Sequence, residues 1–250
     1  MPIVHSKLAR SAPPEIPRIG ILVLDTKFPR ILGDVGNPDT WPFPTMLHTV
    51  PEASPIRVAG EQAKGLVEAF VEAGHELVAA GACGIITTCG FLILHQRRLA
   101  EALPVPVATS NLLQYRTLAR MLPEGRRVGI VTYSREFLTP GFLAAAGLPA
   151  GTPVEGLAPD GYAFRLITYG AETLDPAAME DDVVDAATRL VARRPDVGAL
   201  LIECANMPPY SAAVRAATGL PVFDAYAYFN AFHAALAPAR FGNSDLPGRR

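Results

Sequence analysis

Two stretches of the chain repeat one order of hydrophobic and polar positions. Residues 84–88 and 198–203 are largely apolar runs that lead to a cysteine, Cys89 in the first half and Cys204 in the second. A helical pattern follows each cysteine, and a short Pro-Val run follows each helical pattern. Each stretch therefore predicts a buried strand that ends at a cysteine and turns into a helix.

The spacing of these landmarks is the same in the two halves. The cysteines are 204 − 89 = 115 residues apart, and the prolines that open the Pro-Val runs, Pro106 and Pro221, are 221 − 106 = 115 residues apart. The glycines of two further apolar runs, Gly20 and Gly129, are 129 − 20 = 109 residues apart. This agreement indicates a half-chain duplication, which is a signal about the whole fold.

Most apolar runs are continuous rather than alternating, as expected of parallel strands that are covered on both faces. The predicted strands are 18–24, 46–50, 84–88, 105–108, 127–132, 152–157, 198–203 and 221–223. Helical spacing predicts helices at 60–80, 91–103, 111–122, 134–146, 176–193, 211–217 and 225–236. The alternation predicts an α/β fold with two similar Rossmann-like lobes of parallel strands, related by a pseudo-twofold axis, with the active site in the cleft between them.

The duplication also predicts how the chain is divided. The first α/β lobe takes residues 1–111 together with 225–250, and the second lobe takes residues 112–224. Residues 27–57 form a long, proline-rich connection inside the first lobe. Connections of this length within a compact domain are usually functional or form a lid.

Composition and charge narrow the classes of function. The 250 residues carry a net charge of −2 with no basic block, so nothing indicates nucleic acid or a membrane surface as a partner. No apolar run reaches the ~18 residues of a membrane-spanning helix. The three cysteines have neither framework nor zinc spacing, which indicates reduced thiols and a cytoplasmic protein. The sequence leaves the oligomeric state open, a homo-oligomer included.

Cys89 and Cys204 are the candidate chemical groups. Both are expected at a strand end and at a helix N-terminus, where the helix dipole and free N–H groups favour a thiolate and lower the thiol pKa. A pseudo-twofold axis would bring the two sulfurs to opposite sides of one cleft. Such a pair suits a reaction that removes a proton from one face of a carbon and returns one to the other. Cys83 belongs to a strand entrance, and we interpret it as buried and inert.

Four short motifs connect the chain to a known group of enzymes. They are Leu24-Asp25-Thr26, Thr87-Thr88-Cys89, Val128-Gly129-Ile130-Val131-Thr132-Tyr133-Ser134 and Glu203-Cys204-Ala205-Asn206. Through these motifs, residues 18–233 resemble the cofactor-independent aspartate/glutamate/hydantoin racemase superfamily.

The resemblance implies a function and a mechanism. Cys89 and Cys204 are then the two acid/base thiols: one is a thiolate that takes the Cα proton, and the other protonates the opposite face. The resemblance also implies a small-molecule carboxylate substrate, and neither pyridoxal phosphate nor a metal. We therefore expect an isomerase of amino-acid metabolism, a cofactor-independent racemase or epimerase of an amino acid or related carboxylate. Without a cofactor, N–H groups at the helix starts must stabilise the carbanion.

Several polar residues are candidates for substrate binding. Asp25 matches an acidic residue that closes the first strand in this family, and it either orients a substrate amino group or a thiol, or caps a turn. Hydroxyl groups that suit a substrate carboxylate, and equally suit capping, belong to Thr26, Thr88, Thr132 and Ser134.

The residues after the two cysteines bear on the substrate. Glutamate racemases of the family have Asn-Thr after the first cysteine and Thr-His after the second, whereas this chain has Gly90-Phe91 and Ala205-Asn206. We include Gly90, Ala205 and Asn206 among the substrate-binding positions. The loss of polar groups predicts a substrate that is bulkier or less polar than glutamate. Aromatic residues that favour an apolar pocket are Phe91, Trp41, Phe43 and Tyr210.

Lys27 and Arg57 are two candidate cations in the long connection. Each either binds a second carboxylate of the substrate or is a solvated loop charge.

Other functions stay open. A maleate-type cis–trans isomerase of the same superfamily also uses two cysteines, whereas an arylmalonate-type decarboxylase keeps only the second. From another class, a two-lobed small-molecule binding protein without turnover predicts that replacing both cysteines leaves ligand affinity nearly intact. These alternatives differ in which thiols are required.

Overall fold

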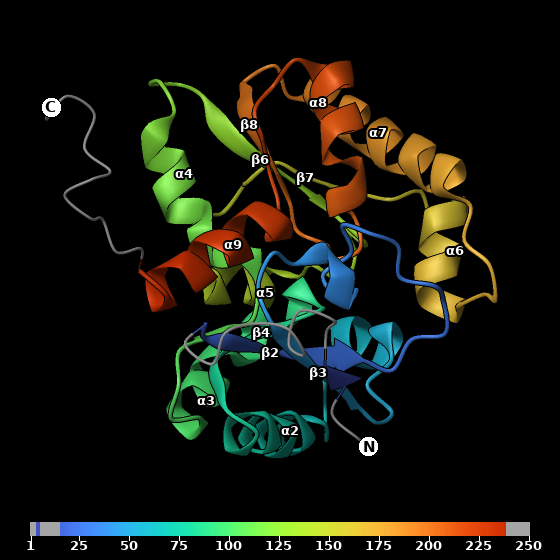
Figure 1. Cartoon of the computed structure of the whole chain (residues 1–250). Coiled ribbons are helices and arrows are strands. Elements are labelled where there is room, and N and C mark those ends of the chain that lie inside the picture. The colour runs from blue at the N-terminus through green and yellow to red at the C-terminus, as the bar shows by residue number, and fades with distance from the viewer. Residues whose placement is uncertain (1–3, 6–15, 239–250) are drawn as a thin grey trace, which may run out of the picture.

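Each half of the chain builds its own sheet (Figure 1). The computed structural model describes residues 4–5 and 16–238. The first sheet has the strand order β1 (Val4–His5), β3 (Thr45–Val50), β2 (Arg18–Leu24), β4 (Ala82–Thr87) and β5 (Val107–Ala108). The second has the order β7 (Val154–Gly156), β6 (Arg127–Thr132), β8 (Val197–Ile202) and β9 (Val222–Phe223). Neighbouring strands are parallel except β1, which is antiparallel to β3. The predicted α/β class with two similar lobes of parallel strands is confirmed.

Helices connect the strands within each lobe. The α-helices are α2 (Val67–Ala79), α3 (Gln96–Ala102), α4 (Tyr115–Met121), α5 (Pro140–Ala145), α6 (Tyr162–Tyr169), α7 (Pro176–Arg193), α8 (Ser211–Thr218) and α9 (Ala225–Leu236). Short segments of tighter or wider helix are η1 (Pro38–Thr40), η2 (Ile56–Gly60), η3 (Gly90–His95), η4 (Asn111–Gln114) and η5 (Pro208–Tyr210). Within residues 4–5 and 16–238, no helix is both long and apolar enough to cross a membrane.

Four α-helices are shorter than the hydrophobic pattern indicated, because the helices predicted at 91–103 and 111–122 open with the 3-10 segments η3 and η4 and become α-helical only in α3 and α4. The helix predicted from residue 60 begins only at Val67, because Gln62 and Ala63 have φ of 57° and 53° and Gly65 has φ of 75°, which a right-handed helix excludes. The helix predicted at 134–146 is confined to α5, where Pro140 fixes the first turn. The connection after β7, expected to be irregular, contains α6.

The duplication extends to the irregularities of the sheets. The pairing of β2 with β4 shifts register between Arg18 and Ile19. The pairing of β6 with β8 shifts register between Arg127 and Val128. These two positions are 127 − 18 = 109 residues apart, the offset that the sequence predicts. The two lobes therefore share a register as well as an element order.

Helices cover both faces of each sheet (Figure 1). In the first lobe α2 packs on one face of β2, β3 and β4, and α9 packs on the other face of β4. Gly84 in β4 makes room for α9, because a Cβ at this position would lie 2.5 Å from a methyl carbon of Leu236. In the second lobe α4 and α7 lie on opposite sides of β6. The lobe boundaries at residues 111 and 224 stay a prediction.

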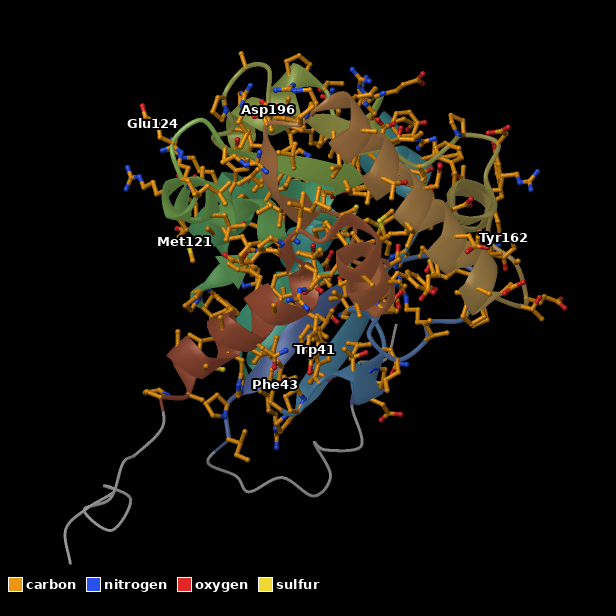
Figure 2. All side chains as sticks on the ribbon, turned by 90° about the horizontal axis from the view of Figure 1, so that it is seen from above. Trp41, Phe43, Met121, Glu124, Tyr162 and Asp196 are labelled. Carbon is orange, nitrogen blue, oxygen red and sulfur yellow. The ribbon has the colours of Figure 1, made fainter. Side chains whose placement is uncertain are left out.

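Trp41 and Phe43 belong to the core rather than to a pocket (Figure 2). The Trp41 ring stacks on Tyr226 of α9 with centroids 5.7 Å apart, and the Phe43 ring stacks on His233 at 3.9 Å. Both side chains are buried. The expectation that they line an apolar binding pocket is therefore wrong, because α9 returns to the first lobe and covers them.

A pair of glycine substitutions tests the packing of α9 on β4. Gly84→Ala should lower the free energy of unfolding by about 1–3 kcal/mol, because the new methyl group overlaps Leu236 and Phe232. Gly141→Ala is the matched control: its Cβ would meet only the Thr139 hydroxyl, at 3.7 Å, so the change should be neutral or stabilising. Urea unfolding of both variants gives the comparison. Equal stability of the two variants would contradict this packing.

Candidate active site

One pocket lies where the carboxyl ends of the strands of both lobes meet. We call it the cysteine pocket. From the first lobe it is lined mainly by Leu24, Thr26, Arg30, Cys89, Gly90 and Phe91. From the second lobe it is lined by Tyr133, Ile167, Glu203, Cys204, Ala205 and Asn206. The space between these atoms is about 370 Å³, but only about 20 Å³ of it is open to the centre of a water molecule. The pocket is therefore narrow, with room for about one water between its walls.

Both cysteines are placed by the strand ends, as the sequence predicts. Cys89 follows β4 with an extended backbone, and its N–H donates to the Thr87 hydroxyl at 3.3 Å. Cys204 follows β8, and its thiol donates to Asn206 Oδ1 at 3.6 Å. The side chains are only 8% and 7% exposed, and both line the same pocket. Cys83 lies outside the pocket and is only partly buried, so the expectation of a buried side chain is wrong; its thiol donates to the Arg18 carbonyl at 3.1 Å.

The expectation that the helix starts lower the thiol pKa values is wrong for this narrow pocket. Burial raises the pKa of the Cys89 thiol to about 12, and the negative charge of Glu203 adds to the effect. Backbone N–H groups and the Arg30 guanidinium oppose this only in part. Burial and Glu203 likewise raise the pKa of Cys204. The segment after Cys89 is the 3-10 helix η3, which leads directly into α3, and the backbone N–H groups at its start do not offset the cost of desolvating a thiolate.

Arg30 is the cation of the pocket, and the sequence did not single it out. Its Nη1 donates to Asp34 Oδ1 at 2.8 Å, and its Nη2 donates to the Thr26 hydroxyl at 3.0 Å. Asp34 Oδ2 in turn accepts a hydrogen bond from Asn206 Nδ2 at 2.8 Å. Because Asn206 contacts the Cys204 thiol, a continuous polar chain runs from the guanidinium in one lobe to the thiol in the other.

Glu203 is a buried carboxyl group immediately before Cys204. It is 1% exposed, and its Oε2 accepts a hydrogen bond from the Thr132 hydroxyl at 2.8 Å. Its Oε1 is buried and has no hydrogen-bond partner among the described residues. Burial raises the pKa of Glu203 from 4.5 to about 7, while the bond from Thr132 works in the opposite direction. A carboxyl with a pKa near neutrality in a pocket is a feature of functional sites.

Five of the eight predicted substrate-binding residues line the cysteine pocket. They are Thr26, Thr88, Gly90, Ala205 and Asn206. Of these, Thr88 uses its hydroxyl to accept the Leu24 N–H at 3.0 Å, so it also fixes the end of β2. Their roles toward a substrate stay a prediction.

The other three predicted residues do not line the pocket. Asp25 is exposed, and its Oδ2 accepts the Glu52 N–H at 3.3 Å, which is the turn-capping role. Ser134 caps a turn by accepting the Phe137 N–H at 3.3 Å. Thr132 is fully buried and does not line the pocket; its hydroxyl donates a hydrogen bond to Glu203.

The two other candidate cations lie apart from the pocket lining. Arg57 pairs with Glu52 at 2.7 Å, and the exposed Lys27 uses its carbonyl to accept the Ala171 N–H at 2.9 Å. The proline-rich connection nevertheless contributes to the pocket through Arg30 and Pro55. In the sequence, Arg30 is only one of several charges in that connection, so nothing marks it as a site residue. Glu203 has a signal, because it is a carboxyl group at the end of an apolar strand and next to a cysteine.

Solved structures of several enzymes share the fold of this chain. An arylmalonate decarboxylase superposes with a TM-score of 0.58 at 19% identity, over 90% of this chain and 94% of that chain. An allantoin racemase from Klebsiella pneumoniae gives 0.60 at 15% identity, over 94% and 95%. A Picrophilus torridus aspartate racemase gives 0.51 at 15% identity, over 92% and 100%. The fold is that of the aspartate/glutamate/hydantoin racemase superfamily, as the sequence motifs predict.

Sequence comparison identifies a family within this class. The chain is 30% identical over 245 residues to dimethylsulfoniopropionate lyase 7 of Emiliania huxleyi (strain CCMP1516), covering 91% of this chain and 70% of that protein. It is 29% identical to a dimethylsulfoniopropionate lyase of Durusdinium sp. clade D, covering 83% and 71%. The chain spans 62% of the length of lyase 3 of the same Emiliania strain. It belongs to the dimethylsulfoniopropionate lyase family. No family-level sequence model matches it.

The Glu203→Gln variant should change how stability depends on pH. Folding raises the pKa of Glu203 from 4.5 to about 7, so in this interval the native state keeps a proton that the unfolded chain releases. The wild type therefore loses about 3 kcal/mol of unfolding free energy as the pH rises through about 7. Glutamine keeps the volume of the side chain but does not titrate. Urea unfolding between about pH 5 and pH 8 should therefore show that the unfolding free energy of the variant changes less with pH than that of the wild type. Parallel curves for the two proteins would refute the raised pKa.

Proposed function

We propose that this protein is a lyase that eliminates dimethyl sulfide from dimethylsulfoniopropionate and leaves acrylate. The observation that carries the proposal is the convergence of two thiols and one guanidinium on a narrow, largely apolar pocket. This pocket occurs in a chain of the dimethylsulfoniopropionate lyase family. The chemistry requires a carboxylate anchor, a base for the Cα proton and a place for a sulfonium group.

Arg30 is the anchor for the substrate carboxylate. Its guanidinium is fixed by Asp34 and Thr26, so it needs little reorganisation when a ligand arrives. Pairing with the guanidinium offsets the negative charge of the carboxylate, so the carboxylate repels the negative charge that develops on Cα less strongly and the Cα proton is easier to remove. The Thr26 hydroxyl also lines the pocket and offers a second contact.

One of the two cysteines is the base. As its sulfur takes the Cα proton, the electron pair of the Cα–H bond forms the Cα–Cβ double bond. The bond between Cβ and the sulfonium sulfur breaks, and its electron pair leaves on neutral dimethyl sulfide. The other thiol lies in the same pocket and donates hydrogen bonds rather than taking the proton.

The walls of the pocket suit the sulfonium end of the substrate. Phe91 and Ile167 provide apolar surface for methyl groups, and the Tyr133 ring stacks on Phe164 at 5.0 Å, which holds its face in place. Aromatic faces attract onium cations. Because the narrow pocket holds about one water, Pro55 and Ala59 from the segment around η2 must move when substrate enters.

Racemisation of a small carboxylate is a second candidate, favoured by the equivalent positions of Cys89 and Cys204 in the two lobes. Racemisation needs a proton donor and an acceptor on opposite faces of one carbon, whereas elimination needs a base on one face only. Deuterium uptake at Cα in heavy water, across a panel of amino acids and hydantoins, measures it. Within that candidate we expect glutamate to exchange poorly, because the polar residues after both cysteines are absent.

Single cysteine replacements test the proposed elimination. Serine is close in size to cysteine but is a far weaker base, so one of Cys89→Ser and Cys204→Ser should lower kcat by more than ~100-fold. The other replacement should cost less, because only one base is needed. Cys83→Ser is the control and should keep the rate within several-fold. The measurement is dimethyl sulfide release by gas chromatography.

Two outcomes would count against the lyase. One is a folded wild type that releases no dimethyl sulfide. The other is near-normal release by both Cys89→Ser and Cys204→Ser. Complete loss of racemisation in both variants, together with exchange of an amino acid by the wild type, would favour the second candidate.

A further inference from the structure

Glu203 marks a difference between two otherwise equivalent strand ends. The position that precedes the cysteine is Thr88 in the first lobe and Glu203 in the second, and 203 − 88 = 115 is the offset of the duplication. Their backbones are held alike: the Thr88 N–H donates to the Leu22 carbonyl at 3.0 Å, and the Glu203 N–H donates to the Val131 carbonyl at 2.8 Å. The fold is therefore built with a small neutral residue at this position in one lobe, so it does not itself require a carboxyl group in the other.

The carboxyl group of Glu203 contacts both halves of the site. It is joined by the chain to Cys204, and it lies against Gly90, the residue after Cys89. A Cβ at position 90 would be 2.0 Å from Glu203 Oε1 and 2.9 Å from its carbonyl oxygen. Position 90 must therefore be glycine for the carboxyl to reach this place. The glycine that replaces a polar residue of the glutamate racemase pattern gives Glu203 its room.

The described pocket lining offers the thiols no other proton acceptor. No histidine or lysine lines it, and Glu203 is its only carboxyl group among the described residues. Arg30 is a cation with donor groups only and cannot accept a proton. Oε1 of Glu203 is buried and unpartnered, so it has a free acceptor site. A thiol that must act as a base is usually activated by an adjacent group that takes its proton.

We infer that Glu203 takes the proton of the active thiol and releases it to water at the end of each turnover. The inference rests on the proposed elimination, because that reaction produces a proton. Dimethylsulfoniopropionate is a zwitterion without net charge, and its products are a neutral sulfide, an anionic carboxylate and one proton. A racemase returns its proton to the substrate and needs no such exit.

The proton and electron balance is complete within these groups. First, the S–H bond of the thiol breaks, its electron pair stays on sulfur, and an O–H bond forms on Glu203. Second, the thiolate takes the Cα proton, the double bond forms, and the sulfide leaves with the electron pair of the C–S bond. Third, the protonated Glu203 gives its proton to water as the pocket opens for product release.

The ionisation properties of the site suit the last of these steps. Glu203 has a pKa of about 7 and so releases a proton readily at neutral pH. Because the pKa of the Cys89 thiol is raised to about 12, transfer of its proton to Glu203 is uphill, so the first step has to be followed at once by removal of the Cα proton, in which the strongly basic thiolate is consumed. Besides burial, the groups that act on the pKa of Glu203 are the Thr132 hydroxyl and the Tyr133 backbone N–H, and both lower it. The other charged or titratable groups near the pocket are the two thiols, the Tyr133 phenol and the ion pair of Arg30 with Asp34.

The test compares Glu203→Gln with wild type over a range of pH. In the wild type, kcat/KM for dimethylsulfoniopropionate should fall below about pH 7 with the loss of one proton acceptor. In the variant, kcat at neutral pH should fall by roughly 100-fold with KM little changed, and the rate should rise through the alkaline range as the thiol itself ionises. Glu203→Asp restores a titrating carboxyl. It should recover part of kcat and the fall in kcat/KM below about pH 7, which we call the acid limb of the profile. Glu155→Gln, which removes another buried carboxyl that does not line the cysteine pocket, is the control and should keep the wild-type profile.

The outcomes separate this inference from the proposed function. A wild type without dimethyl sulfide release overturns both. An active wild type whose Glu203→Gln variant keeps kcat and the acid limb overturns the proton-acceptor role alone. A variant with raised KM and unchanged kcat also overturns it, and shows instead that Glu203 binds the substrate cation. Circular dichroism confirms that each variant is folded before its kinetics are compared.

Discussion

Exclusion of water from the space between the two sheets is the constraint on which the chemistry of this protein depends. The strands of both lobes direct their carboxyl ends to one narrow pocket, where burial shifts the two thiols and the Glu203 carboxyl toward their neutral forms. Burial thus makes each thiol harder to ionise. For the same reason, any thiolate that does form is a stronger base. The same burial raises the pKa of the one carboxyl group in the described lining to about 7, where a proton is both accepted and released.

Polar bridges hold the two lobes in one geometry around this dry space. Asp34 in the proline-rich connection accepts from Asn206 after β8, and Asn111 Nδ2 donates to the Ile202 carbonyl at 2.6 Å. Both bonds are buried and join residues that are far apart in the sequence, so they are stronger than they would be in water and specific in geometry. The bond through Asp34 also fixes Arg30, which couples lobe closure to the position of the anchoring cation.

The fold and the cysteine pair were predictable because a continuous apolar run that ends at a cysteine has few physical solutions, and the chain presents it twice. Residues defined by tertiary contacts were not predictable. Asp25 lies at a strand end like the cysteines, but its side chain turns outward to cap the 52–53 turn. The role of Glu203 depends on its contact with Gly90 from the other lobe, and Arg30 becomes a pocket residue only through Asp34. The break before α2 arises from positive φ angles that no periodicity reports.

The central claim is that Cys89 and Cys204 face one substrate in one pocket. Alkylation of the three cysteines by iodoacetamide, followed residue by residue with mass spectrometry, tests it most directly. Dimethylsulfoniopropionate or acrylate should slow the labelling of Cys89 and Cys204 together, with the same ligand concentration dependence, and leave that of Cys83 unchanged. Protection of only one of the two pocket cysteines, or equal protection of all three, would contradict the account.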